Sequence, residues 1–152
     1  MKILDFLSPE TILTELKSGD KKGVLEELTL PIAKITGIEH KELFRVLIER
    51  EHLGSTGIGN GIGIPHGKLK NLPSLILGLG LSRKGIDFDA LDGKPTHIFF
   101  LLLTPEKSTD LHLKLLARIS KILKEEGFKE KILNSPDRDE VVRLIQGIDQ
   151  EF

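Results

Sequence analysis

The sequence predicts an α/β fold. Stretches with helical periodicity alternate with apolar stretches of strand length, and the links between them are short. The chain has 152 residues, which suits one compact domain with a sizeable core. No internal repeat, low-complexity tract or linker divides it. We therefore expect one α/β domain.

Helical patterns dominate the first third of the chain. Ser8 followed by Pro9 favours a helix near 9–17, because serine caps a first turn and proline suits its first position. A second helix is expected from about 21 to 36, where Pro31 should kink or split it and Gly37 should stop it. A third is expected at roughly 40–52, with a core-facing stripe. The stripe comprises Leu43, Phe44, Leu47 and Ile48.

The segment from Ser55 to Lys68 is the most unusual part of the chain, because glycine occupies every second position from 57 to 63. Alternation with period two predicts a strand with a glycine face, which is usually kept where a ligand or another backbone comes close. Pro65 should end the strand and hold His66 at its end, followed by a small residue. This arrangement predicts a reactive histidine.

The second half of the chain predicts two strands and two helices. An apolar strand is expected at 74–81, followed by a connection at 87–93 that ends in an Asp-Gly turn. The run 95–103 is typical of a buried central strand. A long helix is expected near 109–125, and the last helix follows Asp137. The expected inward side chains are Leu113, Leu116, Ile119, Ile122 and Leu123 in the former and Val141, Leu144 and Ile145 in the latter.

Composition excludes several classes of function. The 22 basic and 23 acidic side chains nearly cancel, so neither a nucleic-acid footprint nor a membrane-surface patch is indicated. The absence of cysteine excludes disulfides, zinc thiolate sites and thiol nucleophiles. The apolar N-terminus is short and interrupted by Asp5, so it predicts neither a signal peptide nor a membrane span. We therefore expect a cytoplasmic protein that is not inserted in a membrane.

Common glycine and histidine motifs fail on spacing. A P-loop would need glycine where Ile62 stands and a hydroxyl residue where Leu69 stands, and the dinucleotide fingerprint fails in every register. The five histidines form no His-Glu-x-x-His pattern or close metal pair, and no Gly-x-Ser-x-Gly elbow exists. We expect no metal and no cofactor. Nucleophilic catalysis by histidine itself is what remains.

A histidine that attacks phosphorus forms a phosphohistidine and can pass the phosphoryl group to a second acceptor. Such a site needs an exposed ring, a group that fixes the tautomer, and donors for three oxygens. Arg50, Ser55, Thr56 and Lys68 are candidate donors, together with the loop backbone. No Mg²⁺ site is obvious, which suits transfer between histidines better than transfer from ATP.

These residues resemble a known signature. Glu51, the pair Ile58-Gly59 and the run Ile62 to Gly67 look like the active-site motif of the type-2 enzyme IIA domains of the bacterial phosphoenolpyruvate:sugar phosphotransferase system (PTS). Fructose and mannitol IIA domains and nitrogen-related regulatory proteins belong to this family. The chain meets every position of the motif except one, because Gly63 stands where alanine is expected.

The resemblance extends over residues 5 to 148 and implies a single PTS EIIA type-2 domain. The segments 86–92 and 94–95 are similar to the region that follows the second active strand. His112, opening the late helix, resembles the second site histidine, and Arg50 resembles the arginine beside the phosphohistidine. The fold implied by the resemblance is a three-layer α/β/α sandwich around a mixed sheet.

The resemblance also implies roles and partners. His66 would be phosphorylated on Nε2 (the tele position) by HPr or its nitrogen-branch counterpart, and would pass the group to a IIB component or use it to regulate target proteins. Arg50 would stabilise the phosphoryl charge, and His112 would support it without being phosphorylated. Ser55, Thr56 and Gly67 are weaker candidates for binding phosphate.

Structural roles compete with these assignments. Arg50 could interact with terminal carbonyls of its helix, His112 could pack as a neutral core histidine, and Ser55 and Thr56 could serve a turn. The remaining candidates have mainly structural interpretations. Lys68 and Lys70 are expected on the solvated surface, His97 as a hydrogen-bonded strand residue, and His40 and His52 at helix ends.

Two functional classes stay open. The chain is either a sugar-transport component of the fructose or mannitol type, or a regulatory protein of the nitrogen branch. Its stand-alone length and the segment 88–90 favour the regulatory branch. A neighbouring gene for a IIB or IIC component would indicate sugar uptake. A third, weaker interpretation is a domain that has lost phosphotransfer and only binds partners.

Overall fold

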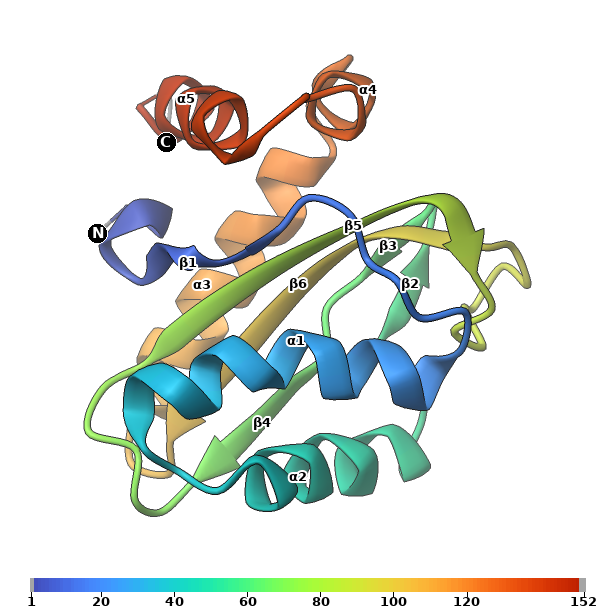
Figure 1. Ribbon diagram of the computed structural model, residues 1–152. Coiled ribbons are helices and arrows are strands. Elements are labelled where there is room, and N and C mark those ends of the chain that lie inside the picture. The colour runs from blue at the N-terminus through green and yellow to red at the C-terminus, as the bar shows by residue number, and fades with distance from the viewer. Residues whose placement is uncertain (1, 151–152) are drawn as a thin grey trace.

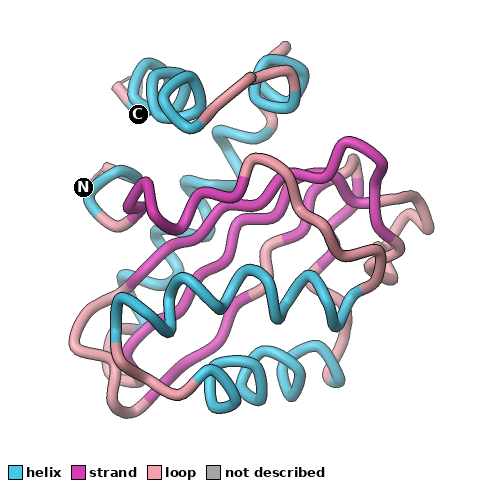
Figure 2. Tube along the Cα trace, viewed as in Figure 1, coloured by secondary structure: helices cyan, strands magenta, loops and turns pink. Residues whose placement is uncertain are grey.

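The computed structural model describes residues 2–150 and shows one six-stranded mixed sheet with helices on both faces (Figures 1 and 2). The strand order is β1-β5-β6-β3-β2. Strand β4 pairs with the same edge of β6 as β3 does, but nearer the C-terminal end of β6. The strands are β1 (Leu7–Leu13), β2 (Gly57–Gly59), β3 (Ile62–Gly63), β4 (His66–Leu69), β5 (Ile76–Ile86) and β6 (Thr96–Pro105). The helices are the short 3₁₀ helix η1 (Ile3–Asp5), α1 (Lys21–Thr36), α2 (His40–His52), α3 (Thr109–Leu123), α4 (Phe128–Leu133) and α5 (Arg138–Asp149).

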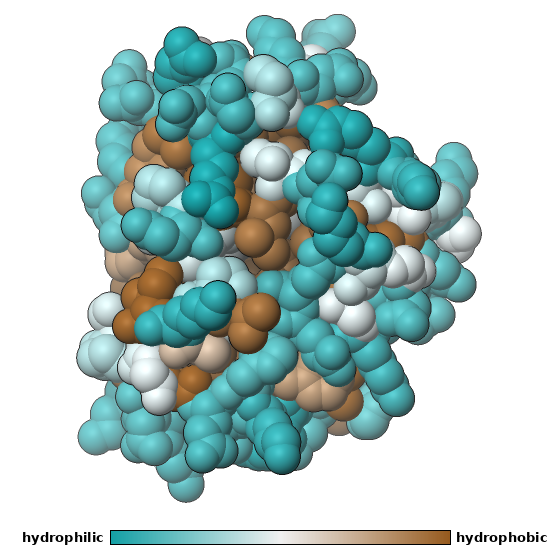
Figure 3. Space-filling model, in the orientation of Figure 1, coloured by the Kyte–Doolittle hydropathy of each residue, from teal (hydrophilic) through white to brown (hydrophobic). Residues whose placement is uncertain are grey.

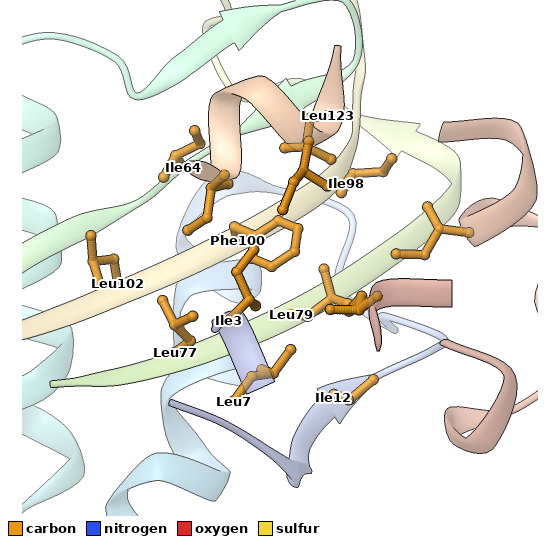
Figure 4. Packing of buried hydrophobic residues seen from close by; sticks show 14 of the residues in the cluster. Ile3, Leu7, Ile12, Ile64, Leu77, Leu79, Ile98, Phe100, Leu102 and Leu123 are labelled. Carbon is orange, nitrogen blue, oxygen red and sulfur yellow. The ribbon is translucent and has the colours of Figure 1, made fainter. Parts of the chain in front are cut away.

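Strand β6 organises the sheet, as the run 95–103 predicts. It pairs antiparallel with β5 on one side and parallel with β3 and β4 on the other. Its side chains alternate between two cores: Phe99 and Leu101 face the helices α1 and α2, whereas Phe100 and Leu102 face α3. Figure 4 shows Phe100 and Leu102 among their partners. The architecture is a three-layer α/β/α sandwich, which confirms the expected fold class.

The prediction of a helix near 9–17 is wrong, because the chain forms the edge strand β1 up to Leu13 and no regular element from 14 to 17. Ser8 and Pro9 carry a local helix signal, but Leu7 and Ile12 are buried by pairing β1 parallel to β5. The Thr11 hydroxyl donates a hydrogen bond to the Leu77 carbonyl across this pair. Proline is tolerated because an edge strand has one side without a partner. A non-local pairing thus overrides the helix propensity.

The glycine-rich segment is a hairpin and not the single strand that was expected. Strands β2 and β3 pair antiparallel around Asn60-Gly61, which adopt φ values of 57° and 78°. An Asn-Gly pair with positive φ favours a tight hairpin turn whose twist matches the flanking strands. Pro65 lies between β3 and β4, so His66 begins a strand and does not end one.

The helices largely follow the sequence patterns. Helix α1 continues through Pro31 and ends at Gly37 in the left-handed conformation (φ 74°), and α2 has the expected bounds. The short helix α4 was not expected. In α3, Leu113 is 59% exposed although it was expected inward, and Leu115 is buried instead. Leu113 is therefore exposed on the surface of the molecule.

The outer surface is mostly hydrophilic on the side shown in Figure 3, with separate apolar areas between the polar side chains. Leu30 and Ile35 of α1 are among the large apolar side chains that remain about half exposed. Within residues 2–150, no helix combines the length and the apolar character needed to cross a lipid bilayer.

Candidate phosphoryl-transfer site

His66 is placed by the register of β4 on β6. It lies opposite Leu102, so its side chain shares the sheet face covered by α3. The next residue, Gly67, faces α2, where an added Cβ would come within 2.5 Å of Val46 Cγ1. The small residue after the histidine therefore lets α2 approach β4 closely.

One hydrogen bond fixes the tautomer of His66. Its Nδ1 lies 2.7 Å from the Ile64 carbonyl oxygen, which can only accept, so the proton is on Nδ1 and the lone pair is on Nε2. Burial lowers the pKa of the ring, the Arg50 charge lowers it further, and the Ile64 carbonyl and Glu51 act in the opposite direction. The half-buried ring is therefore neutral near neutral pH, and the lone pair on Nε2 is free of this hydrogen bond.

His112 lies in the first turn of α3, directly beside His66. The ring centroids are 5.3 Å apart in an edge-on arrangement with an interplanar angle of 66°. Its Nδ1 is 2.7 Å from the Thr104 hydroxyl of β6. Burial, with smaller contributions from His66 and Lys68, lowers the pKa of His112 to about 4. Two neutral imidazoles thus share one site.

Arg50 comes to the site from the last turn of α2. Its Nη1 donates to the Gly54 carbonyl at 2.9 Å, which holds the half-exposed guanidinium beside the loop. An open depression of about 510 Å³ joins Arg50 to both histidines. Its lining comprises Val46, Glu49, Arg50, Leu53, His66, Gly67, Lys68, Thr109, His112, Leu113 and Leu116.

A buried polar network surrounds Glu51, the residue that follows Arg50 in α2. The Glu51 carboxylate accepts from the Thr56 amide and hydroxyl and pairs with Lys21 Nζ at 2.7 Å. The Thr56 carbonyl in turn accepts from the Ile64 amide at 3.0 Å. Because the Ile64 carbonyl holds His66, these contacts connect Lys21 on α1 to the tautomer of the histidine. The role of Lys21 has no signal in the sequence, since it lies far from the motif.

Comparison with known proteins decides the family. The family model for the phosphoenolpyruvate-dependent sugar phosphotransferase system, EIIA 2, matches residues 5–147. The chain is a PTS EIIA type-2 domain. The EIIA domain is 39% identical over 145 residues to a nitrogen regulatory protein of Bradyrhizobium diazoefficiens, with 95% of each chain covered. It is 30% identical over 151 residues to the fructose-specific EIIABC component of Bacillus subtilis, of which it spans 24%.

Solved structures share the fold. The nitrogen regulatory protein IIA-Ntr of Neisseria meningitidis superposes with a TM-score of 0.88 at 31% identity, covering 93% of the EIIA domain and 97% of that chain. IIA mannitol of Escherichia coli has a TM-score of 0.78 at 18% identity, with 91% and 97% covered. The second likeness shows the fold alone.

The structure brings together His66, His112, Arg50 and Gly67 but gives Ser55 and Thr56 structural contacts. The Ser55 hydroxyl donates to the Phe88 carbonyl at 2.8 Å, and the Thr56 hydroxyl is bonded to Glu51. Neither residue lines the depression described above. A phosphate-binding role for these two hydroxyls stays a prediction, and the proposed function does not use it.

Gly63, the one departure from the motif, has a packing environment of its own. A Cβ at this position would lie 3.2 Å from Thr96 Cγ2 and 3.3 Å from Phe99 Cδ1. These distances are tight but need a shift of only a few tenths of an ångström. The side chains of β6 therefore occupy most of the space that alanine would take.

The other histidines lie outside the site. His97 bonds to the Ser82 carbonyl through Nδ1 at 2.9 Å, as its structural interpretation predicts. His40 bonds to Glu26 and Thr29 of α1, and His52 is exposed at the end of α2. Among the described residues, no three His, Asp or Glu side chains gather as metal ligands do.

Proposed function

We propose that this EIIA domain is a phosphoryl carrier whose His66 Nε2 accepts a phosphoryl group from the phosphohistidine of HPr or of its nitrogen-branch counterpart. The bond between phosphorus and the donor nitrogen breaks as the bond to Nε2 forms, and the electron pair returns to the donor ring. The hydrogen bond from Nδ1 to the Ile64 carbonyl carries the proposal, because it leaves the lone pair on the ring nitrogen that faces away from that carbonyl.

The neighbouring residues suit a dianionic phosphoryl group. Arg50 supplies a fixed positive charge, and Lys68, whose Nζ lies 3.0 Å from the Thr109 hydroxyl, supplies a second at the rim. The N-terminus of α3 also favours negative charge through its backbone dipoles. His112 supports the phosphoryl oxygens and is not itself phosphorylated. The proposed step uses no metal and no cofactor.

The rim of the depression suits a protein partner. Leu53 is 84% exposed and Leu113 is 59% exposed, and both lie beside the paired histidines. Exposed apolar side chains around a charged centre are typical of a docking surface. Escherichia coli enzyme IIAMTL, which shares the fold, has been solved in complex with phosphorylated enzyme IIBMTL. We propose that this rim receives the donor and then a IIB component or a regulatory target.

We favour the nitrogen-regulatory branch, with phosphorylation acting as a switch. The nitrogen regulatory protein of Bradyrhizobium diazoefficiens is 39% identical to this chain, whereas the fructose-specific relative of Bacillus subtilis is 30% identical. Sugar transport of the fructose or mannitol type is the alternative, and a partner-binding domain without phosphotransfer is a weaker one. We propose one domain over residues 5–148 acting in the cytoplasm, without nucleic acid or membrane insertion.

The test is labelling with phosphoenolpyruvate, enzyme I and HPr, or their nitrogen-branch counterparts. We expect one acid-labile, base-stable phosphate per chain, and none in His66→Ala. His97→Ala is a matched control, because His97 is also a partly buried strand residue whose Nδ1 bonds to a carbonyl. It should take up label like the parent. Equal labelling of His66→Ala would overturn the assignment, and an unlabelled parent would favour the partner-binding alternative.

A further inference from the structure

Thr104 has a buried hydroxyl in direct contact with the second histidine. Thr104 is fully buried on β6, and it shares the sheet face of Leu102, which lies opposite His66. Its hydroxyl oxygen lies 2.7 Å from His112 Nδ1. Within residues 2–150 this ring nitrogen is the one hydrogen-bond partner found for the hydroxyl. Which of the two groups donates this hydrogen bond therefore depends on the tautomer of His112.

The direction follows from the cost of an unmet donor. If Nδ1–H donated to the hydroxyl, the hydroxyl proton would have no acceptor in the protein interior. An unmet buried donor is rarer and costlier than an acceptor with a spare lone pair. The hydroxyl therefore donates to Nδ1, and the single proton of neutral His112 lies on Nε2.

We propose that Thr104 is a positioning residue that holds His112 as the Nε2–H tautomer, so that the ring can donate a hydrogen bond to a phosphoryl group on His66. The donation itself rests on the proposed function, whereas the tautomer does not. The two rings then have complementary states: His66 presents a lone pair at Nε2, and His112 presents a proton. Neither state requires a charged imidazole.

Two further observations support the assignment. The lowered pKa of His112 keeps the ring neutral near neutral pH, so it carries one proton to be placed. Nδ1 and Nε2 point to opposite sides of an imidazole, so a ring whose Nδ1 faces β6 turns Nε2 away from the strand. His112 also lines the depression that contains His66.

The test reads the ring nitrogens of His112 by long-range ¹H–¹⁵N NMR in the unphosphorylated protein. We expect Nε2 protonated in the parent and in Thr104→Ser, which keeps the hydroxyl. In Thr104→Val, Nδ1 loses its hydrogen-bond donor, so its ¹⁵N signal should move toward that of an unprotonated, unbonded ring nitrogen. The rate of phosphoryl transfer should fall about 10- to 100-fold, by analogy with removal of a residue that orients a metal-ligating histidine, and Thr104→Ser should stay near the parent rate.

Thr96→Val provides the matched control on the same strand. The Thr96 hydroxyl is also buried, and it has no hydrogen-bond partner in the described part of the chain. This variant should change neither the Nδ1 signal of His112 nor the transfer rate. A parent His112 protonated on Nδ1, or an unchanged Nδ1 signal in Thr104→Val, would overturn the proposal. If no variant is phosphorylated, the proposed function fails, and the tautomer still decides the role of Thr104.

Discussion

At the scale of single residues, the site depends on where two neighbouring imidazole rings each hold one proton. The Ile64 carbonyl holds the proton of His66 on Nδ1, and the Thr104 hydroxyl, by our inference, holds that of His112 on Nε2. Burial keeps both rings neutral. A nucleophile and a hydrogen-bond donor can therefore lie side by side without charge repulsion between them.

The lowered pKa of His112 makes the stability of the folded protein depend on pH. His112 has a pKa of about 4 in the folded protein, whereas an unfolded histidine titrates near 6.5. Below about pH 6.5 the unfolded chain gains a proton that the folded chain does not, so the folded state loses stability as pH falls. We expect the free energy of unfolding to drop by up to about 1.4 kcal/mol per pH unit between about 6.5 and 4 from this group.

Urea denaturation between pH 7 and pH 5 measures this effect. The pKa of His66 is also lowered, so it contributes in the same direction. His112→Gln should remove the contribution of His112, so the free energy of unfolding should change less steeply with pH. An equal slope in His112→Gln and the parent would mean that His112 titrates normally in the folded protein.

At the scale of elements, the site depends on how closely α2 approaches β4. Gly67 permits that approach, because a Cβ there would lie 2.5 Å from Val46 Cγ1. Val46 is β-branched and buried in part, so it cannot turn away easily. It also lies one helical turn before Arg50. A shift of α2 would therefore move the guanidinium away from His66.

We expect Gly67→Ala to lower the free energy of unfolding by about 1–3 kcal/mol, the usual cost of overpacking. It should also slow phosphorylation through the displaced Arg50. Adding Val46→Ala to this variant should restore much of the lost stability and of the phosphorylation rate, because it removes the clashing Cγ1 atom. Urea denaturation and the labelling rate give the two readings.

Gly63→Ala is the comparison for this variant. Its Cβ would meet side-chain atoms at 3.2 and 3.3 Å, which need only small shifts, and alanine restricts the unfolded chain. We expect it to stay within about 1 kcal/mol of the parent. If Gly63→Ala were the more damaging of the two, the packing of α2 on β4 would not explain Gly67.

The sequence predicted those elements whose signals are local. Helices α1, α2 and α3 and the central strand β6 follow from their apolar patterns and from Gly37. The segment at β1 was misread because its burial comes from pairing with β5, which lies far along the chain. The Asn60-Gly61 turn carried a hairpin signal that the alternation of glycines concealed.

The site divides in the same way. The motif and the resemblance pointed to His66, His112 and Arg50, and the structure brings them into one depression. Lys21 and Thr104 were not predicted, because each acts through a contact between different elements: Lys21 reaches Glu51 from α1, and Thr104 reaches His112 from β6. Neither contact has a fixed spacing that a single sequence reveals.

At the scale of the whole molecule, η1 and the end of α5 lie side by side although they are far apart in the sequence (Figure 1). Asp149 at the end of α5 is buried and joins three elements. Its carboxylate accepts from the Ile3 amide at 2.6 Å and from Arg118 Nε of α3 at 2.8 Å. The Lys2 ammonium also donates to the Asp149 carbonyl. These contacts fix α5 to η1 and to α3, on the same side of the sheet as α3.

We expect Asp149→Ala to lower the free energy of unfolding by about 3 kcal/mol, because it removes one partner of a buried ion pair. Asp139→Ala, an exposed aspartate in the first turn of α5, is the control and should cost about 0.3–1 kcal/mol. Urea denaturation followed by circular dichroism measures both. Equal effects of the two variants would mean that the contacts between the termini do not stabilise the fold.

The most direct test of the central claim is to locate the phosphoryl group in the phosphorylated protein. Long-range ¹H–¹⁵N NMR, with coupling to ³¹P, identifies both the histidine and the ring nitrogen that carries it. We expect the group on Nε2 of His66, with Nδ1 still protonated toward the Ile64 carbonyl. A phosphoryl group on Nδ1 of His66, or on His112, would contradict this account of the site.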